Sequence, residues 1–142
     1  MRRFIIIVLV CLLIPTTSFA TQISVIIDNE TIEFDVSPTI QDNRVLVPIR
    51  KIFEKFNCNV EWIEKSQTVI ATQNNKIISL RVGKNIIICT DIETGLTKIR
   101  EIDVAPIIQN GRTLVPIRVI SESLNYYVDW IPETNSVIIK TK

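Results

Sequence analysis

The chain has 142 residues, with 16 lysines and arginines against 15 aspartates and glutamates, and it contains no histidine. This near-balance of charge argues against nucleic-acid binding, which needs an excess of basic residues to contact phosphates. The absence of histidine excludes the usual Ser–His and Cys–His nucleophile pairs. The length suits one domain with its own hydrophobic core.

The first twenty residues, MRRFIIIVLVCLLIPTTSFA, have the pattern of a secretory signal peptide. Arg2 and Arg3 form the positive region, residues 4–15 form the apolar region, and Ser18 and Ala20 match the small residues of a cleavage site. The apolar run is shorter than the roughly 20 residues that a membrane span needs, which argues against an uncleaved anchor.

We therefore predict a signal peptide at residues 1–20 and a mature domain at residues 21–142 with no stable membrane span. The mature chain is expected to be secreted or associated with the cell wall. A lipid anchor on Cys11 is disfavoured because bulky Val10 precedes it, where a lipoprotein signal has a small residue.

An internal repeat dominates the remaining sequence, because a shift of 68 residues aligns the chain with itself without a gap. The clearest match is RVLVPIR at residues 44–50 against RTLVPIR at residues 112–118. We predict two repeat units, at about residues 35–72 and 103–140. Such units form one pseudo-symmetric domain when neither can bury its apolar face alone.

The predicted elements run in the same order in both units. In chain order, the first unit has a tight turn at 42–43, a strand at 44–47, a helix starting at Pro48, and a strand hairpin over 60–73. The second unit repeats this order, with Pro116 at the helix start. Proline suits the first helical position, and Asn57 and Asn125 suit the left-handed residue that ends a helix.

Strands are also predicted outside the two units. They are a hairpin before residue 36, two strands around Gly83, and a strand that leads into the second unit. The fold class is therefore α+β, with a mostly antiparallel sheet and two short helices.

The mature chain contains two cysteines, Cys58 and Cys89. Export permits a disulfide between them, but sequence spacing alone does not place their Cα atoms within bonding reach. Two unbridged thiols in a core are the alternative interpretation.

Two tryptophans, Trp62 and Trp130, occupy equivalent positions in the two units and are the candidate binding residues. Each shares a strand face with a valine, Val60 or Val128, which favours a place in the core. The other interpretation is a binding surface on which the indoles contact sugars or partner side chains.

Each unit also contains a candidate structural ion pair at helical spacing, Arg50 with Glu54 and Arg118 with Glu122. Such a pair adds only a few tenths of a kcal/mol to a helix. We hypothesise that each arginine ties its helix to the sheet, with Asp35 and Asp103 as further partners. The alternative is that these arginines bind a ligand.

The repeated pattern P-x-I, turn, R-x-L-V-P-I-R and V-x-W resembles the N-terminal, or stalk, domain of copper amine oxidases. The residues that carry it are 38–70 and 106–138, although Asn57 and Asn125 stand where the family usually has glycine. The resemblance implies a non-catalytic domain, as found in exported bacterial proteins without an oxidase portion. The histidines that hold copper in the oxidases are absent, so no metal, cofactor or catalytic residue is expected.

The expected function is a non-catalytic stalk or binding module of the cell envelope. Its partner would be an envelope protein or a cell-wall polymer. The alternatives are a lectin-like protein that binds wall glycans through Trp62 and Trp130, and a secreted enzyme that uses carboxylates such as Glu61 and Asp129.

Overall fold

The computed structural model describes residues 22–142, so the predicted signal peptide lies outside the described part of the chain. These residues form strands, two α-helices and two 3-10 turns, with the following bounds: β1 Ser24–Ile27, β2 Glu30–Thr31, β3 Thr39–Gln41, β4 Arg44–Pro48, α1 Ile49–Lys55, β5 Asn59–Ile63, η1 Glu64–Ser66, β6 Thr68–Gln73, β7 Lys76–Arg81, β8 Ile86–Asp91, β9 Thr97–Glu101, β10 Ile107–Gln109, β11 Arg112–Pro116, α2 Ile117–Ser123, β12 Tyr127–Ile131, η2 Pro132–Thr134 and β13 Ser136–Lys140.

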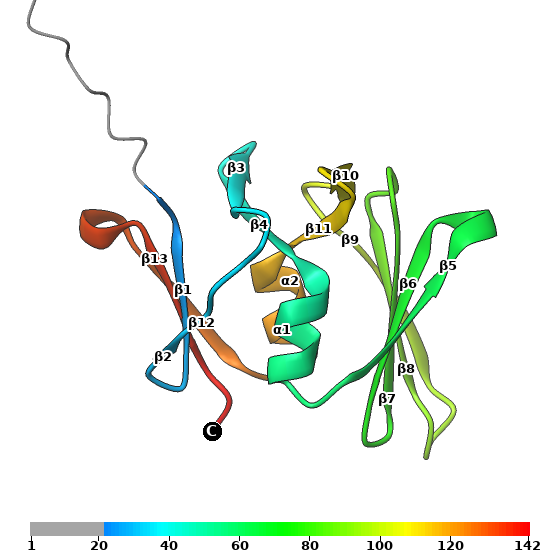
Figure 1. Ribbon diagram of the computed structural model, residues 1–142. Helices are drawn as coiled ribbons and strands as arrows, with labels where there is room; N and C mark the ends of the chain where they lie inside the picture. Colours follow the sequence, from blue (N-terminus) through cyan, green and yellow to red (C-terminus); the bar gives the residue numbers. More distant parts are fainter. Residues whose placement is uncertain (1–21) are drawn as a thin grey trace, which may run out of the picture.

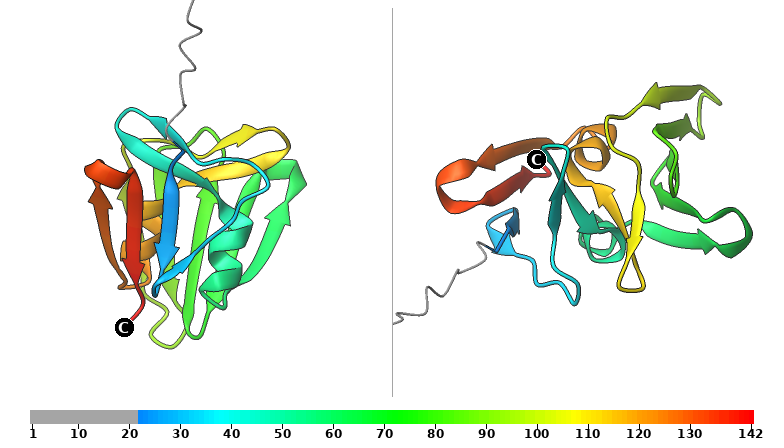
Figure 2. Two further views of the ribbon diagram at one scale, coloured as in Figure 1. Left: turned by 60° about the vertical axis from the view of Figure 1, so that its left-hand side comes forward. Right: turned by 90° about the horizontal axis from the view of Figure 1, so that it is seen from above.

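The strands form three sheets, with the orders β12-β13-β1-β2, β10-β11-β4-β3 and β5-β6-β7-β8-β9. The first and third sheets stand on opposite sides of the two helices, and the second crosses above them (Figure 1). The view from above shows the hairpins β5–β6 and β12–β13 on opposite sides of the molecule (Figure 2). The predicted α+β class with mostly antiparallel sheets is confirmed.

The elements of the two halves recur at the sequence offset of 68 residues. The series β3, β4, α1, β5, η1 and β6 has its counterpart in β10, β11, α2, β12, η2 and β13. The two halves meet where β4 pairs antiparallel with β11, with Val47 opposite Val115. Because these two valines are equivalent residues, an approximate two-fold axis passes between them.

The predicted turns and helix ends are confirmed by the backbone. Asp42 and Asn43, with φ of 47° and 59°, form the two-residue turn between β3 and β4. Positive φ at both positions matches the twist of a tight hairpin. Asn57 and Asn125 follow α1 and α2 with φ of 55° and 62°, so each adopts the left-handed conformation predicted for it.

The prolines lie one position earlier than predicted. Pro48 and Pro116 are the last residues of β4 and β11 and precede the helices, which begin at Ile49 and Ile117. Their ψ values of 114° and 111° are extended, since both residues still pair with the neighbouring strand. Proline therefore ends each strand here and precedes the first helical residue.

The N-terminal strand joins the C-terminal half, which the sequence did not predict. β1 pairs in parallel with β13 along its whole length, and β2 covers only two residues instead of a full hairpin arm. Beyond β1, the backbone N–H and the hydroxyl of Thr141 donate to the carboxylate of Asp28 at 2.9 Å and 2.6 Å. These hydrogen bonds lower the pKa of Asp28.

A hydrophobic core lies between the helices and the sheets and includes residues of both halves. Apolar residues of both helices are buried, among them Phe53 and Ile120, which have no exposed surface. The main core cluster extends from Val25 in β1 to Ile139 in β13. A chain that begins at residue 21 therefore contains the whole described core.

Candidate functional site

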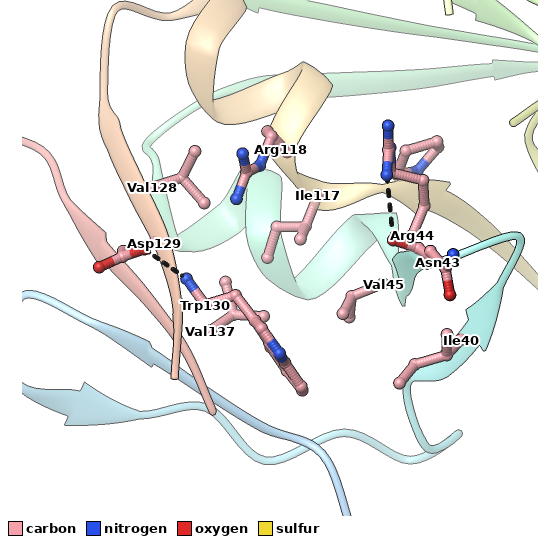
Figure 3. Close-up of a pocket in the computed structure, with 11 residues that line it drawn as sticks. Ile40, Asn43, Arg44, Val45, Ile117, Arg118, Val128, Asp129, Trp130 and Val137 are labelled. Atoms are coloured by element: carbon pink, nitrogen blue, oxygen red, sulfur yellow. Dashed lines mark hydrogen bonds between the residues drawn. The ribbon is translucent and has the colours of Figure 1, made fainter. Parts of the chain in front are cut away.

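Two grooves flank the axis between the halves, and we name them after their helices. The α2 groove has a volume of about 350 Å³, and the α1 groove has a volume of about 480 Å³. Both volumes fall in the range of small-molecule sites, roughly 300–1,000 Å³. Figure 3 shows the side chains that line the α2 groove.

Each groove has one wall made by the helix start and the following hairpin of the same half. In the α2 groove this wall contains Pro116, Ile117, Arg118, Val128, Trp130 and Val137. In the α1 groove it contains the residues 68 positions earlier: Pro48, Ile49, Arg50, Val60, Trp62 and Val69.

The opposite wall of each groove comes from the other half of the chain. The first-half hairpin β3–β4 supplies Ile40, Asn43, Arg44 and Val45 to the α2 groove. The second-half hairpin β10–β11 supplies the equivalents Ile108, Gly111, Arg112 and Thr113 to the α1 groove. Each groove therefore forms only when both halves fold together.

The predicted helical ion pairs do not form. Within residues 22–142, no ion pair joins Arg50 to Glu54 or Arg118 to Glu122. Glu122 instead lies 3.9 Å from Arg100 of β9. Both Arg50 and Arg118 are exposed and line the grooves, so neither is tied to the sheet as hypothesised.

The two aspartates do bind arginines, but the partners are the first arginines of the repeated heptapeptides. Arg44 donates to Asp103 through Nε at 2.9 Å, and Arg112 donates to Asp35 through Nε at 2.8 Å. Each pair crosses from one half to the other, as the two-fold axis requires. The guanidinium of Arg112 holds the pKa of Asp35 below its usual value.

The internal repeat contained a signal for these crossed ion pairs. Both arginines and both aspartates recur at the 68-residue offset. The local spacing gave no reason to connect them, since 59 and 77 residues separate the partners.

Each tryptophan combines the two predicted alternatives, a place in the core and a place on a surface. Trp62 and Trp130 are half-buried, pack against the core and line the α1 and α2 grooves with their other surface. The indole N–H of Trp62 donates to the carboxylate of Glu64 at 2.5 Å. The position equivalent to Glu64 is Pro132, and among residues 22–142 the Trp130 indole N–H has no hydrogen-bond acceptor.

The two cysteines are free thiols in the structure. Cys58 is buried after α1, and Cys89 is half-buried on β8. Burial raises the pKa of the Cys58 thiol to about 11, because the charged thiolate is poorly solvated in the core.

The carboxylates considered for an enzyme are not brought together. Glu61 lies in β5 and Asp129 in β12, on the sheets at opposite sides of the helices (Figure 1). Asp129 accepts hydrogen bonds from the backbone N–H of Trp130 at 2.8 Å and from the hydroxyl of Tyr127 at 3.3 Å. Glu61 lines neither groove, so these two carboxylates do not form a pair in either groove.

The fold and the grooves define a two-half β-rich domain with two matched concave surfaces. Comparison with family profiles matches residues 26–141 to the family described as Copper amine oxidase N-terminal domain. This match spans most of the chain, so the chain belongs to the copper amine oxidase N-terminal domain family. A search of curated proteins finds no match.

Copper itself does not fit the residues present. The chain has no histidine, and the described residues contain no group of three or more cysteine, aspartate or glutamate side chains that could hold a metal ion. Imidazole is a favoured protein ligand of copper. No helix within residues 22–142 has the length and apolar character that a membrane crossing needs.

Proposed function

We propose that this protein is an exported, non-catalytic module of the bacterial cell envelope that acts as a stalk and binds an envelope component. Its family is the non-catalytic N-terminal part of copper amine oxidases. The pair of matched grooves is the observation that carries the binding role. A spacer without a ligand would need only the core, whereas here two tryptophans and two unpaired arginines line concave surfaces at equivalent positions.

Exposed arginines with no structural partner support binding over scaffolding. Arg50 and Arg118 take part in no ion pair with residues 22–142. A guanidinium that contributes little to folding, in a groove next to an indole, is available to bind a carboxylate or phosphate.

Export is proposed from the signal-peptide pattern of residues 1–20. We would fuse these residues to a phosphatase reporter that is active only outside the cytoplasm of a Gram-positive host. Reporter activity is expected, and it should fall when Arg2 and Arg3 are both replaced by glutamate. An inactive fusion that accumulates in the cytoplasm would contradict export.

Binding is tested with a chain that starts at residue 21. We would incubate it with washed Gram-positive cell walls and, separately, with solubilised envelope proteins, and measure the bound fraction by sedimentation and by pull-down. Saturable retention on either is expected. A matched variant with both Arg50 and Arg118 replaced by alanine should fold normally and lose retention. No retention of the parent chain on either material would contradict the binding role.

A lectin-like wall-glycan binder is the second candidate. The position of both tryptophans in the grooves favours it, because an aromatic ring can pack on the apolar face of a sugar. Retention on walls stripped of protein, but not on envelope proteins, would select this candidate.

A further inference from the structure

The two grooves differ in their charged side chains, although residues at equivalent positions build their walls. The ionisable side chains lining the α2 groove are Arg44, Arg118 and Asp129. Those lining the α1 groove are Asp35, Arg50, Lys51, Glu54, Glu64 and Arg112, which gives three of each sign. The crossed pairs Arg44–Asp103 and Arg112–Asp35 are each neutral. Outside these pairs, Glu54 and Glu64 balance the cations lining the α1 groove, while the lining of the α2 groove has Arg118 and Asp129.

The single carboxylate of the α2 groove does not offset its cations at the ligand-facing surface. Asp129 is held by the backbone N–H of Trp130 and the hydroxyl of Tyr127. Figure 3 shows its carboxylate pointing away from the other labelled side chains of the groove. Arg118 is therefore the charged group that the α2 groove presents to an incoming ligand.

One of the two cations is free to bind. Arg44 is already paired with Asp103 through Nε at 2.9 Å. Arg118 makes no hydrogen bond or ion pair through its side chain within residues 22–142, and it is exposed. A guanidinium in this state can take a carboxylate through two parallel hydrogen bonds.

The availability of the indole N–H as a hydrogen-bond donor also differs between the grooves, and this difference again favours the α2 groove. Trp62 donates its N–H to Glu64, so that donor is occupied. Pro132 stands at the equivalent position in the second half and leaves the donor of Trp130 available. The α2 groove therefore offers an aromatic surface, a free N–H donor and a free guanidinium together, with Ile40 and Val45 on the facing wall.

We propose that the α2 groove, and not the α1 groove, binds an acidic saccharide. The apolar face of a sugar ring lies against Trp130, and the carboxylate of the sugar binds Arg118. A basic ligand would be repelled by Arg118, and a purely apolar ligand would leave the guanidinium and the indole N–H unused. This inference rests on the proposed binding function and names its ligand class.

The test uses the chain from residue 21 with Trp62→Phe, which leaves Trp130 as its single tryptophan. Its fluorescence is titrated with hexagalacturonate, with the fully methyl-esterified hexamer, and with a glycerol phosphate oligomer that has no sugar ring. Hydrogen bonds to charged groups contribute about 1.5–3 kcal/mol, which is a factor of about 10–100 in affinity. We expect the esterified hexamer and the ring-free phosphate to bind at least tenfold more weakly than the acidic hexamer.

Arg118→Ala and Arg50→Ala are the matched variants in the same background. The first should weaken hexagalacturonate binding at least tenfold, and the second should change it less than twofold. Equal losses in both variants, equal binding of the esterified hexamer or of the ring-free phosphate, or no binding of hexagalacturonate at 10 mM would each overturn the proposal.

The outcome is separable from that of the proposed function. Retention of the chain on cell walls without binding of hexagalacturonate overturns the acidic-saccharide proposal alone. Absence of retention on walls and on envelope proteins overturns the proposed function as well.

Discussion

Replacing Phe53 with alanine should remove a large part of the stability of the domain. The side chain lies on α1, has no exposed surface and is among the largest fully buried groups. A buried aromatic ring removes about 150–250 Å² from water, which corresponds to about 4–6 kcal/mol at about 25 cal/mol per Å². Alanine retains the Cβ atom, so we expect a loss of about 3–5 kcal/mol in the free energy of unfolding.

Urea denaturation followed by tryptophan fluorescence measures this loss. With a slope of about 2 kcal/mol per M, a loss of about 4 kcal/mol lowers the unfolding midpoint by about 2 M. Ser121 occupies the equivalent position on α2, is equally buried, and donates its hydroxyl to the carbonyl of Ile117 at 3.0 Å.

Ser121→Ala is the matched control for Phe53→Ala. It should change the stability by less than about 1 kcal/mol, because alanine is the better helix former and the carbonyl is part of the helix. A loss below about 1 kcal/mol for Phe53→Ala, or equal losses at both positions, would refute the reasoning that the Phe53 ring is a large, fully buried part of the core.

Three further predictions concern single contacts. The pKa of Asp28 is lowered from 3.8 in the folded state, so its stabilising effect is complete above about pH 5 and is lost as the pH falls through the lowered value. Asp28→Asn should reduce the fall in melting temperature between pH 5 and pH 2, and an unchanged acid profile would contradict this. At neutral pH a thiol reagent should label Cys89 before the buried Cys58. The chain from residue 21, denatured without a reducing agent, should contain two reactive thiols. The absence of reactive thiols in that sample would indicate a disulfide. Arg44 and Asp103 are both well exposed, so a double-mutant cycle should give a coupling free energy of about 0.2–1 kcal/mol that vanishes in 1 M salt. A larger or salt-independent coupling would argue against an exposed pair.

The local elements of the fold could be predicted from the sequence because neighbouring residues specify them. The turn at Asp42 and Asn43 and the left-handed residues Asn57 and Asn125 depend on backbone preferences of one or two positions. The buried face of α1 follows from apolar residues at helical spacing. The helix start was displaced by one residue, because pairing between β4 and β11 holds Pro48 in the extended conformation.

The candidate site was predicted only in part. Both tryptophans and the arginines that end the repeated heptapeptides lie in the grooves. The partners of the arginines were wrong, because helical spacing connected Arg50 to Glu54, whereas the ion pairs that form link Arg44 and Arg112 to aspartates of the opposite half. Helical neighbours on an exposed face gain too little to hold one geometry.

The sequence by itself determined the repeat, its turns, its helices and the residues that enter the core, because these features depend on short-range spacing. Only the tertiary structure decided how the halves meet. The pairing of Val47 with Val115 brings each hairpin against the helix of the other half, and β1 pairs in parallel with β13 from the far end of the chain. The grooves and the crossed ion pairs follow from contacts between residues far apart in sequence, which no local pattern specifies.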